Sequence, residues 1–228
     1  MATIHRVFVT GGTGYIGKRL IPALHALGHT VVALTREESR AKLPCTCTPV
    51  IGDALDGDSY RSYVEGADTF VQLVGVSHPS PAKADQFRRV DLRAGLEAVR
   101  VASAVQVRHF IYVSVAQPAP VMQSYLAVRA ECEQAIAARG LAATVLRPWY
   151  VLGPGHLWPY ALLPFYKMAE FMPQTREGAL RLGLLNIGQM VRALARAVAE
   201  PCDGMRVLNV AEIRALGTAP TFTQKNSH

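Results

Sequence analysis

The sequence predicts an α/β protein, a doubly wound and mostly parallel sheet covered by helices on both faces. Apolar strand-like runs alternate with helix-like stretches, the turns between them are short, and a glycine-rich turn joins the first strand to the first helix. Half of the 228 residues are hydrophobic, which is enough for a large core and excludes a disordered chain. We therefore expect one domain over residues 1–216 and a disordered tail over 217–228.

The expected elements follow this alternation from the amino end. Ile4–Thr10 is an apolar first strand, and the helix Tyr15–Leu27 ends at Gly28. Apolar runs rich in β-branched residues predict the later strands, at Thr30–Thr35, Pro49–Ile51, Thr69–Val74, His109–Ser114, Ala142–Leu146 and Arg206–Val210. Longer amphipathic stretches predict the later helices, at Gly57–Val64, Gln86–Val105, Ser124–Arg139 and Gly188–Glu200. Gly140 ends the third of these helices.

The alternation stops after Pro148, where a reduced C-terminal substrate segment is expected over about 149–185. Seven of the chain's 17 aromatic residues lie between Trp149 and Phe171. They could fill the core or form the wall of a binding pocket, and the proline-rich loop character favours the pocket. The stretch Pro148–Tyr166 has no charged residue but contains four prolines and two glycines, so it is not expected to span a membrane.

Composition narrows the partners and the setting. The net charge of +7 is spread along the chain without a basic stripe, which argues against nucleic acid and for a small-molecule substrate. The pair Cys45 and Cys47 matches no common zinc spacing and the seven histidines form no ligand pattern, so no metal is expected. No signal peptide is recognisable at the start, which predicts a cytoplasmic protein with free thiols. A homodimer is possible.

The strongest chemical signal is the turn Thr10-Gly11-Gly12-Thr13-Gly14-Tyr15-Ile16-Gly17. In a G-x-x-G-x-x-G turn, Gly11 permits the tight bend, Gly14 lets the backbone approach a pyrophosphate, and Gly17 allows the helix to pack closely on the sheet. Phosphate charge then meets N–H groups at the positive end of the helix dipole. A strand before and a helix after this turn make a purely structural role the weaker interpretation.

This turn resembles the cofactor turn of the extended and atypical short-chain dehydrogenase/reductases, which include epimerase/dehydratase-like and NmrA-like NAD(P)-binding proteins. Further landmarks are Gly52-Asp53-Ala54, Gly75, Val113-Ser114, Leu146-Arg147-Pro148 and Gly153-Pro154-Gly155. The resemblance implies a Rossmann-like fold and a set of cofactor-binding residues: Gly11, Gly12, Thr13, Gly14, Tyr15, Ile16, Arg36, Asp53, Ala54, Val74, Gly75, Tyr125, Arg129 and Pro148. The family's larger substrate region is shortened here.

The residue that follows the second strand predicts which nicotinamide cofactor binds. An acidic side chain there accepts hydrogen bonds from the ribose 2′-OH of NAD, whereas a basic one pairs with the 2′-phosphate of NADP. Arg36 holds this position, so we expect NADP(H) in preference to NAD(H). The adjacent Glu37 and Glu38 leave open the alternative that Arg36 is a solvated surface residue.

The resemblance also implies a reaction centre. The family uses a Tyr-x-x-x-Lys pair together with a Ser or Thr after the fifth strand, which makes Ser114, Tyr125 and Arg129 the catalytic candidates. Tyrosine ordinarily ionises near pH 10, so acid–base work requires a nearby cation. The spacing of Tyr125, Arg129 and Glu133 places them on one helix face. Arg129 replaces the family's lysine, and an exposed Arg129–Glu133 pair is the structural alternative.

Two function classes follow from these residues. The first is an NAD(P)-dependent oxidoreductase or epimerase-like enzyme acting on a small carbonyl, alcohol or quinone-like substrate, with Tyr125 as the proton donor. The second is a non-catalytic NAD(P)-binding redox sensor or structural protein of NmrA-like type. Ser114 and Tyr125 favour the enzyme, whereas Arg129 in place of lysine favours the sensor.

Overall fold

A computed structural model describes residues 3–76, 80–119, 121–154 and 182–218 of the chain. Seven strands form one sheet in the order β3-β2-β1-β4-β5-β6-β9, and each neighbouring pair runs parallel. The strands are β1 (Arg6–Thr10), β2 (Thr30–Thr35), β3 (Thr48–Ile51), β4 (Thr69–Gln72), β5 (His109–Val113), β6 (Ala143–Leu146) and β9 (Met205–Leu208). The predicted doubly wound, Rossmann-like α/β fold is thereby confirmed.

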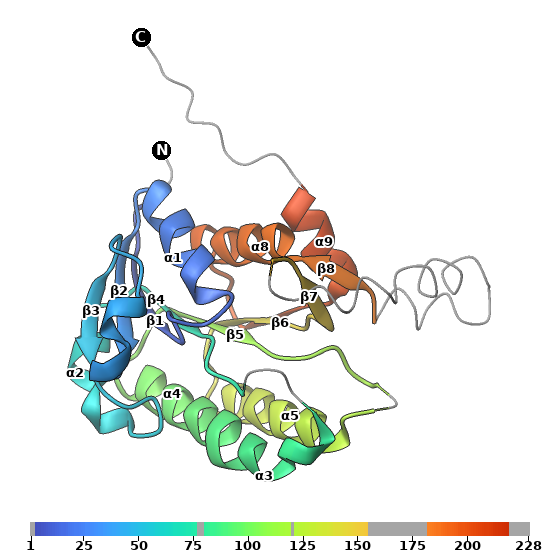
Figure 1. The fold of residues 1–228 in the computed structure, drawn as a ribbon. Helices are drawn as coiled ribbons and strands as arrows, with labels where there is room; N and C mark the ends of the chain where they lie inside the picture. Colours follow the sequence, from blue (N-terminus) through green and yellow to red (C-terminus); the bar gives the residue numbers. More distant parts are fainter. Residues whose placement is uncertain (1–2, 77–79, 120, 155–181, 219–228) are drawn as a thin grey trace.

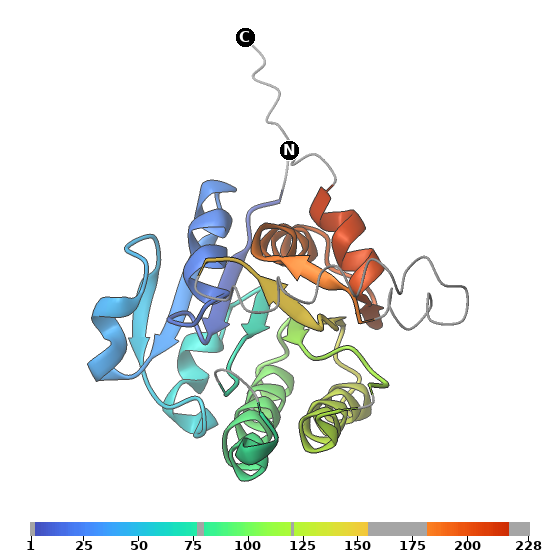
Figure 2. The ribbon, with the colours of Figure 1, turned by 45° about the vertical axis from the view of Figure 1, so that its right-hand side comes forward.

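Helices cover both faces of this sheet (Figures 1 and 2). One face carries α1 (Gly17–Ala26), α8 (Ile187–Ala199) and α9 (Val210–Thr218), and the other carries α4 (Arg93–Ala104) and α5 (Gln123–Ala138). Side chains alternate along each strand, so Val7, Val9 and Ile111 pack under α1 and α8. Phe8 and Phe110 point the other way, into the core beneath α4 and α5.

Shorter elements complete the described chain. They are the 3-10 turns η1 (Glu37–Lys42), η2 (Gly57–Ser59) and η3 (Pro81–Lys83), the helices α2 (Arg61–Val64) and α3 (Ala84–Gln86), and the π-helical segment η4 (Phe87–Leu92). The predicted helix over 86–105 therefore begins as a π-helix. Strands β7 (Tyr150–Leu152) and β8 (Leu184–Asn186) pair in parallel as a second, two-stranded sheet that the sequence did not predict.

The prediction at the carboxyl end was wrong in two respects. Strand β9 ends at Leu208, and Val210, placed in that strand from the sequence, begins helix α9. Gly217 and Thr218, assigned to a disordered tail, belong to α9, and the lack of a side chain at Gly217 leaves room for the close packing of α9 on α8. A Cβ at Gly217 would lie 2.5 Å from the Cα of Gln189. Residues 219–228 and most of the aromatic segment, 155–181, lie outside the described residues.

The strand order places the switch point of the sheet between β1 and β4, where successive connections leave in opposite directions. In such sheets, ligands bind outside the carboxyl ends of the strands at this point. Thr10 pairs in register with Gln72, so the turn after β1 and the loop after β4 leave the sheet side by side. Among the described residues, no helix is long and apolar enough to cross a membrane.

Candidate functional site

The glycine turn follows β1 and is packed from below by the loop after β4. Gly11 has φ +73°, and a Cβ there would lie 2.8 Å from the carbonyl carbon of Leu73. A Cβ at Gly17 would overlap the backbone of Gly11 and Gly12. These two positions require glycine for backbone geometry and close packing, as the motif predicts.

Gly14 differs, because it is exposed and its added Cβ would meet only the Gly11 carbonyl oxygen, at 3.1 Å, among the described atoms. Helix α1 then begins without a side-chain cap and without an acidic residue in its first turn. The N–H groups of Lys18 and Arg19 already donate to the carbonyls of Gly14 and Ile16, at 3.1 and 3.0 Å, so an anion would meet the N–H groups that precede them at the helix start. The open backbone at Gly14 and the uncapped helix fit a dinucleotide pyrophosphate.

Tyr15 of the glycine turn packs against a second motif, the Gly153-Pro154 segment. The Arg19 guanidinium lies over the Tyr15 ring, 4.4 Å from its centroid, and donates to the Tyr15 carbonyl at 2.8 Å. A Cβ at Gly153 would overlap the Tyr15 hydroxyl, so the Gly153-Pro154 segment packs against the turn. The structure thus brings together two motifs that lie far apart in the sequence.

Arg36 lies directly after β2, on the surface. Its Nε is 3.3 Å from Oε1 of Glu38, and both side chains are about two-thirds exposed, at 69% and 67%. An ion pair this exposed is weak, so a phosphate could displace the glutamate. The structure therefore places Arg36 on the exposed loop after β2 and pairs it with an acidic side chain.

The remaining cofactor candidates follow the carboxyl ends of their strands. The exposed Asp53 accepts a hydrogen bond from the Leu55 N–H at 2.9 Å, which fixes its carboxylate in the turn after β3 next to Ala54. Val74 and Gly75 lie in the loop after β4. Pro148 is buried after β6, and its carbonyl accepts the Ala116 N–H at 2.9 Å.

Helix α5 carries Tyr125, Arg129 and Glu133 at intervals of four, but each has a different partner. Tyr125 is half-buried, its ring centroid lies 5.0 Å from that of Phe87, and the Arg129 guanidinium carbon lies 5.0 Å from the Tyr125 ring centroid. The exposed Arg129–Glu133 pair considered from the sequence does not form. Arg129 is buried and its Nη2 lies 2.5 Å from Oδ1 of Asp91.

The Arg129 guanidinium has further acceptors in the sheet. Its Nη1 donates to the Tyr112 hydroxyl at 3.2 Å and to the Val113 carbonyl at 3.1 Å. Burial raises the pKa of the Asp91 carboxyl, an effect that the Arg129 charge opposes. Burial likewise raises the pKa of Tyr112, so its phenol stays protonated. Asp91 carries no motif, and sequence reasoning missed it.

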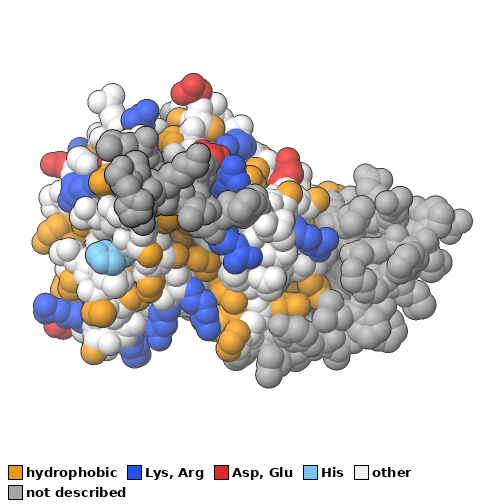
Figure 3. Space-filling model, turned by 90° about the horizontal axis from the view of Figure 1, so that it is seen from above, with side chains coloured by type: hydrophobic (Ala, Val, Ile, Leu, Met, Phe, Trp, Pro, Cys, Tyr) orange, Lys and Arg blue, Asp and Glu red, His pale blue; other side chains and the backbone are white. Residues whose placement is uncertain are grey.

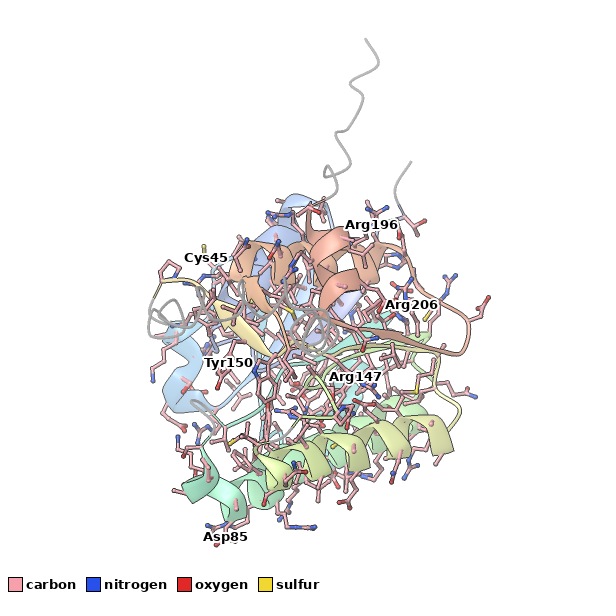
Figure 4. The ribbon with its side chains drawn as sticks, turned by 90° about the vertical axis from the view of Figure 1, so that its right-hand side faces the viewer. Cys45, Asp85, Arg147, Tyr150, Arg196 and Arg206 are labelled. Carbon is pink, nitrogen blue, oxygen red and sulfur yellow. The ribbon has the colours of Figure 1, made fainter. Side chains whose placement is uncertain are left out.

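Ser114 is buried at the end of β5, where its hydroxyl donates to Oε1 of Glu133 at 2.5 Å. Gln117 Nε2 donates to the same oxygen at 3.1 Å. Arg147 pairs with both Glu133 oxygens, and its Nε lies 3.1 Å from Oε1. Figure 4 shows Arg147 beside helix α5. Since the Ser114 proton is committed to a carboxylate, the serine has lone pairs to offer a ligand. Gln117 is a second polar residue that the sequence did not single out.

The surroundings of Tyr125 are apolar. A small cluster of buried side chains, Val115, Ala119 and Leu126, packs against Tyr125, Trp149 and Leu182. The Trp149 and Tyr150 rings meet edge to face, with centroids 5.5 Å apart. On the face shown in Figure 3, hydrophobic side chains are interspersed with Lys and Arg that form no stripe. The described residues hold no group of three or more metal-ligating side chains.

Together, the sheet, its switch point and the open glycine turn define a dinucleotide-binding α/β protein. Residues 11–154, more than half of the chain, match the family described as NAD(P)H-binding. The chain therefore belongs to the NAD(P)H-binding family, and it is of the atypical short-chain dehydrogenase/reductase type that the sequence resembles.

Individual relatives agree with this assignment. The chain is 32% identical to a 3-diazoavenalumate denitrifying reductase from a Streptomyces species, over 87% of this chain and 74% of that protein. It is 24% identical to the ceramide reductase of Caulobacter vibrioides, over 90% of this chain but 65% of that protein. The Bordetella bronchiseptica enzyme WbmH, solved with NAD+, has a TM-score of 0.67 at 22% identity, covering 90% and 75% of the two chains. That likeness concerns the fold.

Proposed function

We propose that the protein is an NAD(P)H-dependent oxidoreductase that reduces a small, apolar carbonyl or quinone-like substrate, with Tyr125 as the proton donor. The observation that carries this proposal is the position of Tyr125: it is half-buried among apolar side chains and packs directly against the Arg129 guanidinium. The Streptomyces relative reported above is also named a reductase, which supports a reduction in general.

The glycine turn would hold the pyrophosphate, with Thr13, Gly14, Tyr15 and Ile16 offering backbone and helix-end contacts. Asp53 and Ala54 would face the adenine, and Val74, Gly75 and Pro148 would line the rest of the cofactor site. When bound, the reduced nicotinamide supplies the hydride. Tyr125 would give its phenolic proton to the substrate oxygen, which is general acid catalysis.

Ser114 would contribute by accepting a hydrogen bond, because its own proton is donated to Glu133. It can orient a hydroxyl, such as the phenol of Tyr125 or the alcohol product. The polarisation of a substrate carbonyl would then depend on Tyr125 and the neighbouring Arg129 guanidinium.

We further propose that NADP(H) is preferred over NAD(H), on the basis of Arg36. The Arg36–Glu38 pair costs little to break because both side chains are solvated. A 2′-phosphate carries more charge than one carboxylate and accepts bidentate hydrogen bonds from a guanidinium.

Substitution of Tyr125 tests the catalytic role. Purified protein is assayed for NADPH oxidation against quinones and apolar aldehydes, and NADPH affinity is measured directly by fluorescence. Tyr125→Phe is expected to lower turnover by roughly 10²- to 10⁴-fold with little change in cofactor affinity. Tyr63→Phe is the matched control, since Tyr63 is exposed on α2. An active enzyme whose turnover survives Tyr125→Phe would refute the mechanism.

The second candidate is a non-catalytic NAD(P)-binding redox sensor. Two observations favour it: the Arg129 charge is paired with Asp91, and the Ser114 proton is committed to Glu133. This candidate predicts tight NADPH binding without oxidation of NADPH by any substrate of the panel. In that case, Tyr125→Phe leaves binding unchanged and Gly14→Val removes it.

We place this activity in the cytosol. All four cysteines are free, including the exposed Cys45 near the half-buried Cys47. Free thiols are the norm in a reducing compartment.

A further inference from the structure

Two facing pairs of residues join the π-helical segment η4 to helix α5. Phe87 and Asp91 lie four residues apart on η4, and Tyr125 and Arg129 lie four residues apart on α5. The Phe87 and Tyr125 rings lie with their centroids 5.0 Å apart, and Asp91 and Arg129 form the ion pair at 2.5 Å. A π-turn inside an α-helix is rare and occurs often at functional sites. Here both side chains of the π-helical segment contact the residues of α5 that form the proposed reaction centre.

The second carboxylate oxygen of Asp91 holds the loop after β4. Oδ2 accepts the Val76 N–H at 3.0 Å, so one fully buried carboxylate binds both the loop and Arg129. The guanidinium in turn fills the space above Gly75, where a Cβ would lie 2.5 Å from Arg129 Nη2 and 3.0 Å from Asp91 Oδ1. Gly75 is therefore required for the pair to reach the loop.

The same loop touches the glycine turn at its other end. A Cβ at Gly11 would lie 2.8 Å from the Leu73 carbonyl carbon and 2.9 Å from the Val74 nitrogen. The loop over residues 73–76 thus lies between the proposed pyrophosphate site at Gly11 and the helix that carries Tyr125. A dinucleotide that runs from Gly14 to Tyr125 has to pass this loop.

Stability alone does not explain a buried ion pair. Removing two charges from water costs about as much as their attraction returns, and well-packed apolar residues are often at least as stabilising. What the pair adds is a fixed geometry. The two Asp91 oxygens contact two different elements, the loop after β4 and helix α5, and Arg129 also donates to the Tyr112 hydroxyl and the Val113 carbonyl. Each contact fixes the loop relative to the sheet and to α5.

We propose that Asp91 is a positioning residue for cofactor binding, which holds the loop 73–76 through Val76 and Arg129 so that the reactive half of the dinucleotide meets Tyr125. This inference rests on the proposed NAD(P)H site. It assigns to Asp91 no contact with the substrate.

The test compares two ligands that differ in the half of the dinucleotide that they contain. Adenosine 2′,5′-bisphosphate requires the adenosine side of the site, whereas NADPH also requires the side beyond the loop. Asp91→Asn retains an acceptor for the Val76 N–H but removes the charge that pairs with Arg129. It is expected to weaken NADPH binding by at least about fivefold, the lower end of ordinary coupling between sites. Affinity for adenosine 2′,5′-bisphosphate is expected to stay within about twofold.

Asp58→Asn is the matched control, because Asp58 also pairs with an arginine, Arg100, at 2.9 Å but is 73% exposed. Its affinities for NADPH and for adenosine 2′,5′-bisphosphate should equal those of the unmodified protein. Where Asp91→Asn does not fold by circular dichroism, Arg129→Lys replaces it, since a lysine cannot satisfy all the acceptors of the guanidinium. The same split between the two ligands is expected.

The outcomes separate the two levels of inference. If the unmodified protein binds neither NADPH nor NADH, the proposed function fails. If it binds NADPH and the folded variant binds it equally well, the role of Asp91 is overturned. An equal loss of affinity for both ligands also overturns that role, because it shows a general effect on the fold.

Discussion

The Ser114 hydroxyl donates to Oε1 of Glu133 at 2.5 Å, and both side chains are buried. Helix α5 thereby holds the end of β5 from two turns beyond Tyr125. The same carboxylate receives Gln117 and Arg147, so one residue anchors the β5 loop and the start of the segment after β6. The first prediction follows from this concentration of donors on a single acceptor.

Glu133→Ala is expected to lower the free energy of unfolding by about 3–5 kcal/mol, because it leaves a partly buried arginine without its counter-charge. Glu133→Gln keeps an acceptor for Ser114 and should cost about 1–3 kcal/mol. Urea denaturation measures both. Glu131→Ala, an exposed neighbour on the same helix, should stay within about 0.5 kcal/mol of the unmodified protein. A loss below about 1 kcal/mol in Glu133→Ala would contradict the anchoring role.

Two glycines of the turn should respond differently to the same substitution. Gly14→Val is expected to abolish NADPH binding while the far-ultraviolet circular dichroism stays native, because the side chain fills open space in front of the backbone. Gly17→Val should lose folded protein instead, since its side chain would collide with the backbone of Gly11 and Gly12. NADPH binding that survives Gly14→Val would exclude this turn from the pyrophosphate site.

Arg36→Ala should weaken NADPH binding by roughly tenfold, the value of one charge-assisted hydrogen bond to a phosphate, and leave NADH binding nearly unchanged. Glu38→Gln should strengthen NADPH binding, because it releases Arg36 from its exposed partner. Isothermal titration calorimetry with both cofactors measures these effects. An equal loss for NADH and NADPH in Arg36→Ala would remove this residue from the 2′-phosphate site.

The buried His109 is expected to lower the stability of the folded protein at acidic pH. Burial, aided by the charge of Arg206, lowers its pKa to about 4. The unfolded chain therefore binds a proton more readily than the folded protein between about pH 6.5 and pH 4, so stability falls as the pH falls through this window. The full effect is about 3 kcal/mol, from a shift of roughly two and a half pH units.

The comparison of His109→Gln with the unmodified protein isolates this contribution. In the variant, the decline in unfolding free energy between pH 7 and pH 4 should be smaller by up to about 3 kcal/mol. Glutamine can still hydrogen-bond Thr144, which His109 contacts at 3.0 Å. His25→Gln, on the exposed side of α1, should leave the pH profile unchanged. Parallel profiles for His109→Gln and the unmodified protein would exclude His109 as the titrating group.

Much of the fold was predictable because its signals are local. Apolar runs at β1, β2 and β5 and the glycine-rich turn give strand, turn and helix without reference to the rest of the chain. The errors lie where local signals compete with packing. The chain after Leu208 forms helix α9, whose Gly217 packs closely against Gln189 of α8, a contact that no sequence pattern predicts.

The reaction centre divides in the same way. The sequence by itself determined that Tyr125, Arg129 and Glu133 share one helix face, because a spacing of four residues does so in any α-helix. Only the tertiary structure decided their partners, since Asp91 comes from 38 residues before Arg129, and Arg147 follows strand β6, 14 residues after Glu133. Ion pairs between distant segments depend on how the layers pack, and burial then makes each choice of partner costly to change. The sequence therefore determines which side chains are present at this site. The packing of η4, α5 and β6 determines which of their charges are already paired and which are available to a ligand.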